Sequence, residues 1–99
     1  MSENIAARVG TDIARSIRYL VKEEKTDKSK LIRELLADAV NSRMLDLALE
    51  KYSKKSISLG KAAELAGVSI AEFMKVAAER KIPLHYSVSS LENDFRAVA

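Results

Sequence analysis

Apolar and polar residues alternate at the start of the chain, in the stretch NIAARVGTD that begins at residue 4. The two alternating sets are Ile5, Ala7 and Val9 on one side and Asn4, Ala6 and Arg8 on the other. A period of two predicts a short, half-buried β-strand over residues 4–9, which Gly10 ends. A single strand leaves unpaired N–H and C=O groups along both edges, so this strand needs a partner.

After this run the apolar residues recur at the spacing of an amphipathic helix. Thr11 or Asp12 can cap that helix at its N-terminus. Its apolar face consists of Ile13, Ile17, Leu20 and Val21, and its polar face carries Arg15, Arg18 and Lys22. We therefore expect a first helix directly after the strand.

A second helix follows the polar segment KEEKTDKSK, with Thr26 or Asp27 as its cap. Its apolar positions are Leu31, Ile32, Leu35, Leu36, Ala39 and Val40, and the pattern continues weakly to Tyr52. The helix either runs through or breaks at Asn41 and Ser42, because both are poor helix formers. The polar segment SKKS at 53–56 is the expected linker to the rest of the chain.

Two shorter helices joined by a tight turn are predicted after the linker. Ser58 can cap the helix LGKAAELA, and Gly67 suits the left-handed conformation that ends it. Ser69 and Glu72 form a capping box for IAEFMKVAAERK, which Pro83 stops. This arrangement matches a helix–turn–helix unit.

Composition limits the classes of function. The chain has 99 residues, no Cys and a single His, so neither a disulfide framework nor a zinc site of ordinary composition can form within one chain. That residue, His85, is expected to be a partly buried tail residue. Neither a nucleophile–base pair nor a glycine-rich phosphate loop is present, so we expect no enzyme, no catalytic residues, no metal and no cofactor. Without a signal peptide or membrane span, the expected location is cytoplasmic.

A second copy of the chain is the expected partner of the N-terminal strand. The other candidate strand, residues 84–88, lies beyond at least four helical segments, so the simplest pairing is antiparallel across a two-fold axis. The outward residues of such a two-stranded ribbon fit the DNA major groove. Residues 1–30 hold seven Lys and Arg against five Asp and Glu, a bias that suits a polyanion. The alternative is a frayed N-terminal segment before an ordinary helical domain.

The order of strand, GTD, amphipathic helix and TDKSKLIRELLADAV resembles the ribbon–helix–helix repressors over residues 3 to about 50. The resemblance implies that the base-reading residues are Asn4, Ala6 and Arg8 and that a DNA phosphate is held by Lys28 and Ser29. The chemistry agrees, because Arg can bond guanine, Asn can pair with adenine, and a helix N-terminus binds anions. Ala6 departs from the polar residue often found at the middle position, which implies modest base specificity.

The second helix of the helix–turn–helix unit presents few groups that could read DNA. Its expected exposed positions are Ser69, Ile70, Ala71, Met74, Lys75 and Ala78. Only Ser69 and Lys75 could hydrogen-bond to a base or phosphate. This surface fits a protein partner better than DNA, and a second DNA reader stays as the alternative.

The C-terminal half contains ISLGKAAELAGVS, ERKIPLHYS and LENDF in that order, and over residues 45–96 it resembles a family of small uncharacterised prokaryotic proteins. Its members are thought to be antitoxins of toxin–antitoxin pairs. The resemblance implies a partner toxin of the PIN-domain ribonuclease class, which the C-terminal segment wraps while the N-terminal dimer represses the shared operon. The expected toxin-binding residues are Leu84, Tyr86, Val88, Leu91, Phe95 and Arg96.

The tail has more apolar anchors than it can bury by itself, as in segments that become ordered on a partner. Alternatively, it folds back onto its own helices or onto the dimer mate. Arg96 either reaches a carboxylate of the nuclease or pairs with Glu92 on a solvated face.

These patterns predict a mainly α fold. A ribbon–helix–helix domain over residues 1–52, with one short strand pairing across a homodimer, is followed over 53–99 by a helix–turn–helix-like pair and an extended tail. The expected function is an antitoxin that neutralises a toxin and autoregulates its operon by binding double-stranded operator DNA, with toxin bridging dimers into a higher assembly. The alternative is a helical dimer that acts as a protein-interaction adaptor without binding DNA.

Overall fold

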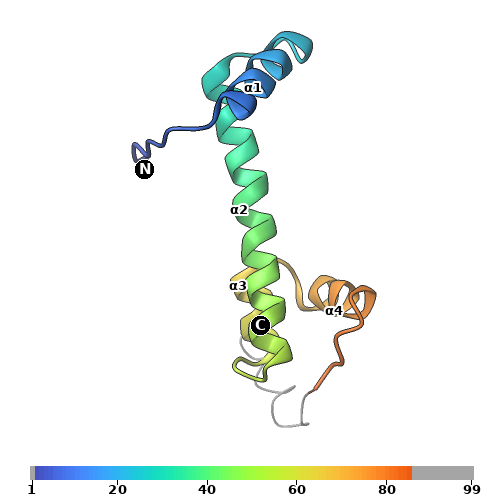
Figure 1. Ribbon diagram of the computed structural model, residues 1–99. Coiled ribbons are helices and arrows are strands. Elements are labelled where there is room, and N and C mark those ends of the chain that lie inside the picture. The colour runs from blue at the N-terminus through green and yellow to red at the C-terminus, as the bar shows by residue number, and fades with distance from the viewer. Residues whose placement is uncertain (1, 86–99) are drawn as a thin grey trace. The chain divides into compact units, whose positions relative to one another are not determined.

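The computed structural model describes residues 2–85 of the chain, and within them every regular element is an α-helix (Figure 1). The helices are α1 (Thr11–Glu23), α2 (Lys28–Ser53), α3 (Leu59–Ala66) and α4 (Ile70–Glu79). The prediction of a mainly helical fold is therefore confirmed. None of these helices is both long enough and apolar enough to cross a membrane.

The strand predicted over residues 4–9 is wrong. Residues 2–10 precede α1 as an exposed segment without regular secondary structure, and Ile5 is 85% exposed. Alternation specifies a strand only where one face is buried and a neighbour completes the hydrogen-bond ladder, and no segment within 2–85 does either. Two of the six residues are alanines, which are depleted in strands. The predicted ribbon–helix–helix fold required that strand, so this prediction is wrong, and the described residues have an all-helical fold.

The candidate strand over residues 84–88 is also not formed in the part of it that the structure describes. Leu84 and His85 are not in a strand, and the remaining residues of that stretch lie outside the described part of the chain.

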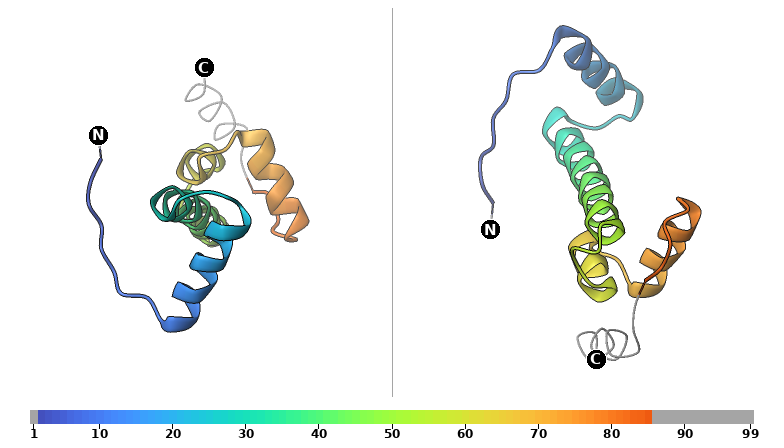
Figure 2. Two further views of the ribbon diagram at one scale, coloured as in Figure 1. Left: turned by 90° about the horizontal axis from the view of Figure 1, so that it is seen from above. Right: turned by 60° about the horizontal axis from the view of Figure 1, so that its bottom comes forward.

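Two compact units divide the chain within α2. Unit 1 runs from Met1 to Asp38, and unit 2 runs from Ala39 to Ala99. The predicted domain boundary lay after residue 52, close to the end of the same helix. α2 is continuous, as the views in Figure 2 also show, so the alternative of a break at Asn41 and Ser42 is wrong.

The helix caps of unit 1 differ in kind. α1 follows Gly10 in an extended conformation and has no side-chain cap, so the predicted cap at Thr11 or Asp12 is wrong. Asp27 caps α2, because its Oδ1 accepts a hydrogen bond from the amide of Lys30 at 2.8 Å.

Unit 2 holds the hydrophobic core. The buried residues are Ala48, Leu49 and Tyr52 from α2, Leu59, Ala62, Ala63 and Ala66 from α3, and Phe73 and Ala77 from α4. The two largest, Tyr52 and Phe73, meet edge to face with ring centroids 5.6 Å apart. This aromatic pair joins the end of α2 to α4.

The pair α3 and α4 has the predicted helix–turn–helix connection. Ser58 Oγ accepts from the amide of Lys61 at 3.1 Å, and Ser69 Oγ accepts from the amide of Glu72 at 3.0 Å. Gly67 ends α3 in the left-handed region with a φ of 71°. The N-caps Ser58 and Ser69 and the turn at Gly67 are therefore as the sequence predicted. The second bond of the predicted capping box, from the amide of Ser69 to the carboxylate of Glu72, is not formed within the described residues.

The helices end in a common turn whose left-handed residue is usually a lysine. After α2, the amide of Ser56 donates to the carbonyl of Lys51 and the amide of Lys55 donates to that of Tyr52, both at 2.9 Å. Glycine occupies the left-handed position only after α3, whereas lysine occupies it after the other helices, at Lys25, Lys55 and Lys81, with φ of 51°, 60° and 59°. This conformation costs a side-chain-bearing residue roughly 1–2 kcal/mol.

Candidate functional site

The residues predicted to read DNA bases are exposed on the N-terminal segment. Asn4, Ala6 and Arg8 all lie before α1 and are accessible to solvent. Because this segment is not a strand, the described chain does not force the three side chains onto one face. Arg8 nevertheless keeps a guanidinium that can donate two hydrogen bonds to guanine, whereas Ala6 offers only a methyl contact.

Lys28 and Ser29, the predicted phosphate-binding pair, lie exposed in the first turn of α2. This helix end presents backbone amides and the positive end of the helix dipole to an anion. The carboxylate of Asp27 already accepts from the amide of Lys30, however, and its charge opposes a second anion. The arrangement is therefore a weaker phosphate site than the sequence pattern implies.

Unit 1 exposes most of its apolar side chains. Leu31, at 2% exposure, is the only buried residue within 2–38, and α1 contains none. The unit 1 apolar surface is defined here by its exposed large hydrophobic residues, which are Ile5, Val9, Ile13, Tyr19, Leu35 and Leu36. Segments of fewer than about 40 residues rarely build a sufficient core without oligomerisation or another support. We therefore treat this surface as the candidate interaction site of unit 1.

The outward face of α4 carries few recognition groups. Ser69, Ala71, Lys75 and Ala78 are exposed, but Ile70 and Met74 pack against the core of unit 2, contrary to their expected exposure. The exposed positions within α4 also include Glu72 and Glu79, which leaves Lys75 as the one exposed cation of this helix. It offers little for reading base edges.

The predicted toxin-binding residues are represented in the described chain by Leu84. Its side chain is 39% exposed, while Tyr86, Val88, Leu91, Phe95 and Arg96 lie outside the described residues. His85 is partly buried, as predicted, and its backbone amide donates to the hydroxyl of Tyr52 at 2.8 Å. No local spacing in the sequence connects residues so far apart, so the pattern did not predict this contact.

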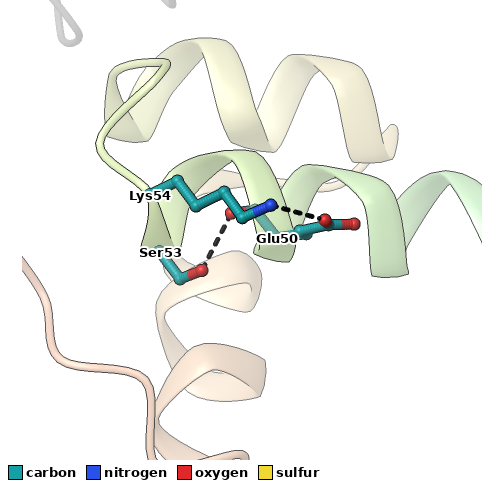
Figure 3. A network of polar contacts seen from close by, with 3 residues as sticks. All are labelled: Glu50, Ser53 and Lys54. Atoms are coloured by element: carbon teal, nitrogen blue, oxygen red, sulfur yellow. Dashed lines mark hydrogen bonds and ion pairs between the residues drawn. The ribbon is translucent and has the colours of Figure 1, made fainter.

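A basic turn, defined as residues 51–56, covers the last three residues of α2 and the three residues that follow it. It contains Lys51, Lys54 and Lys55 and no Asp or Glu. Lys54 Nζ donates to Glu50 Oε1 at 2.9 Å, and Ser53 Oγ donates to the carbonyl of Glu50 at 2.8 Å. Figure 3 shows both contacts as dashed lines. The hydrogen bond and the charge of Lys54 lower the pKa of Glu50, and Lys51 adds to the effect. The turn is therefore a local centre of positive charge.

Metal binding finds no support in residues 2–85, where no group of three His, Cys, Asp or Glu side chains is placed to hold an ion.

A family model described as "Uncharacterised protein family (UPF0175)" matches residues 3–99. A protein of that family name from Archaeoglobus fulgidus is 42% identical over 52 residues, which cover 52% of this chain and 60% of the relative. Relatives of the same name from Aeropyrum pernix and Halobacterium salinarum are 44% and 49% identical, over 50% and 52% of this chain and 56% and 51% of their own lengths. The chain thus spans little more than half of the curated relatives it matches. No solved structure matches it.

Proposed function

We propose that this chain, which belongs to the uncharacterised protein family UPF0175, is a homodimeric antitoxin that binds DNA through unit 1 and a toxin through its C-terminal segment. The observation that carries the proposal is the unit 1 apolar surface, which lies among exposed cations on the same short segment. The names of the relatives specify no activity, so the support comes from the surfaces of the chain itself.

A second copy is the partner that we propose for the unit 1 apolar surface. Fully burying a large apolar side chain contributes about 1.5–3 kcal/mol, and each Å² of buried apolar area contributes about 25 cal/mol. The six side chains are about half exposed, so burying them removes roughly 300 Å² of apolar area per protomer. A standard interface takes about 800 Å² from each partner, of which roughly 450 Å² is apolar. The surface therefore supplies most of the apolar area that a dimer requires. A two-fold dimer uses the same patch twice, so no other surface is needed.

DNA binding is supported by the cations around this surface. The exposed cations of residues 8–30 are Arg8, Arg15, Arg18, Lys22, Lys25, Lys28 and Lys30. A dimer doubles their number, which strengthens attraction to the phosphate backbone. In this proposal Arg8 and Asn4 contact bases of the operator, and Lys28 and Ser29 contact a phosphate.

The C-terminal segment is the proposed toxin-binding part. The part of this segment that the structure describes includes Leu84, whose apolar side chain is exposed, and His85, which is partly buried. The hydrogen bond between His85 and Tyr52 holds this part on unit 2. A segment that is already anchored at one end loses less conformational freedom when it binds. The proposed toxin is a ribonuclease of the PIN-domain class, which is the class implied by the family resemblance of this half.

A protein-interaction adaptor is the second candidate, and two observations favour it. The exposed residues of α4 include the carboxylates of Glu72 and Glu79 and a single cation, Lys75, and Asp27 competes with a phosphate at the start of α2. An adaptor uses the same dimer surface but needs no contact with DNA.

Fluorescence anisotropy on the DNA immediately upstream of the gene separates the two candidates. We expect tight, salt-dependent binding by the wild type and a loss of about 1–3 kcal/mol of binding free energy in Arg8→Ala, with the dimer intact by sedimentation. Arg43→Ala removes an equal charge from an exposed position of unit 2 and serves as the matched control. Equally weak binding by all three proteins would leave the adaptor.

A further inference from the structure

We propose that the basic turn, residues 51–56, is a second contact for the phosphates of double-stranded DNA, with Lys55 as its central cation. This inference rests on the proposed DNA binding and adds to it a contact from unit 2 that is independent of base sequence.

The charge of the turn is of one sign. Lys51, Lys54 and Lys55 occur there without an acidic residue, and Lys61 follows in α3. Lys54 is paired with Glu50, and Lys61 lies 3.6 Å from Glu64. In the described chain no carboxylate lies within 4.0 Å of the other two ammonium groups, those of Lys51 and Lys55. A row of cations suits a regular polyanion, because every position along DNA offers a phosphate.

The backbone conformation at Lys55 favours glycine, yet the residue at this position is a lysine. Its φ of 60° lies in the left-handed region, which glycine adopts freely and which the chain fills with Gly67 after α3. Lys55 therefore occupies a position where glycine would be less strained. Two other lysines share this conformation, but Lys25 follows Glu23 and Glu24, and Lys81 closely follows Glu79. Only at Lys55 does the strained lysine stand in a turn without acids.

The place of the turn in the fold suits a phosphate contact. It leads into α3, the first helix of the helix–turn–helix pair, and the first helix of such units crosses the DNA backbone. The exposed residues of α4 include Glu72 and Glu79 and a single cation, Lys75, so α4 offers little for reading base edges, and the contact proposed for this unit is with phosphates. Lysine suits that role because it binds phosphate as a point charge, without sequence preference.

The test compares Lys55→Gly with Lys81→Gly, which makes the same substitution at an exposed lysine of unit 2 whose φ is 59°, against 60° at Lys55. Anisotropy titrations use full-length protein, the upstream duplex and an unrelated duplex, over a series of KCl concentrations. We expect Lys55→Gly to raise Tm by a few degrees, because it relieves the left-handed lysine, and yet to bind both duplexes more weakly. The slope of log K against log salt should fall by about 1.

Two further variants separate charge from backbone. Lys55→Asn removes the charge, and asparagine tolerates the left-handed region, so the slope of log K against log salt should fall by the same amount as in Lys55→Gly. Lys55→Arg keeps the charge and should keep the wild-type slope. An unchanged slope in Lys55→Gly and Lys55→Asn, with DNA bound normally, would overturn this inference and leave the proposed function standing. An equal loss in Lys81→Gly would overturn it too, since the effect would then be one of general charge. Absence of DNA binding by the wild type would overturn both proposals.

Discussion

The hydroxyl of Tyr52 contacts both backbone polar groups of His85. It accepts from the amide of His85 at 2.8 Å and donates to the carbonyl at 3.3 Å. The two rings stack with centroids 4.1 Å apart and an interplanar angle of 13°, and Nε2 of His85 bonds to the carbonyl oxygen of Tyr52. Because Tyr52 is fully buried, these contacts fix the segment after α4 to the end of α2.

Tyr52→Phe should destabilise unit 2 through the loss of one oxygen. The ring of Phe can still stack and pack against Phe73, but the part-buried amide of His85 loses its acceptor. We expect the free energy of unfolding to fall by about 1–3 kcal/mol, which is the cost of an unsatisfied buried donor. Urea denaturation should show a lower midpoint at an unchanged m-value.

Tyr19→Phe is the matched control, because Tyr19 is 64% exposed on α1. Its unfolding free energy should stay within about 0.5 kcal/mol of the wild type. If Tyr52→Phe changed stability as little as this control, the hydroxyl would not be what holds the segment.

At the left-handed positions that end the helices, glycine should give a higher free energy of unfolding than a residue with a side chain. Lys81→Gly should raise the unfolding free energy by about 0.5–1 kcal/mol, because the conformational cost of roughly 1–2 kcal/mol exceeds the gain of about 0.3–1 kcal/mol from a cation at a helix end. Gly67→Ala should lower it by about 1 kcal/mol through φ alone, since an added Cβ meets no atom within 4 Å. Thermal unfolding followed by circular dichroism measures both. A lower Tm in Lys81→Gly would mean that the lysine side chain stabilises the turn by more than its backbone costs.

The start of α3, its end at Gly67 and the start of α4 were predictable because their signals are local, whereas the predicted cap of α1 was wrong. Ser58, Gly67 and Ser69 act on groups no more than about five residues away, so a short stretch of sequence contains the whole interaction. The N-terminal strand failed for the opposite reason. Alternation over residues 4–9 is informative only if a neighbour buries one face, and the stretch itself does not specify that neighbour.

The candidate site was predictable only in part. The exposure of Asn4 and Arg8 follows from their polarity, but their common face depended on the missing strand. The contact between Tyr52 and His85 spans 33 residues, and neither helical nor strand spacing connects them. Such contacts depend on how α2 and the segment after α4 pack, which one sequence pattern does not encode.

Leu36→Lys should abolish the proposed dimer without unfolding unit 2. Leu36 is half-exposed on the part of α2 that belongs to unit 1, so an ammonium there would be buried unpaired in the interface. Sedimentation velocity should show a dimer for the wild type and a monomer for the variant, with unit 2 still folded by circular dichroism. Leu47→Lys makes the same change at an exposed leucine of unit 2 and should remain dimeric. A wild type that is monomeric at tens of micromolar would rule out the dimer.

Lys54→Met should raise the pKa of Glu50 toward its usual value of 4.5, because the hydrogen bond and charge of Lys54 are the main causes of its lowering. A carboxyl with a lowered pKa in the folded chain adds stability above its unfolded pKa, and loses it as the pH falls through the folded pKa. The stability difference between wild type and variant should therefore vanish in acid. It should be small at neutral pH, because both side chains are more than half exposed.

An NMR titration of the Glu50 carboxyl carbon measures this shift directly. Lys61→Met is the control, because Lys61 contacts Glu64 instead and its loss should leave the pKa of Glu50 where it is. The same pKa of Glu50 in wild type and Lys54→Met would show that the pair in Figure 3 does not persist in solution. Lys54 would then be available to DNA phosphates together with Lys55, and the salt dependence of DNA binding should reflect one more contact from the basic turn.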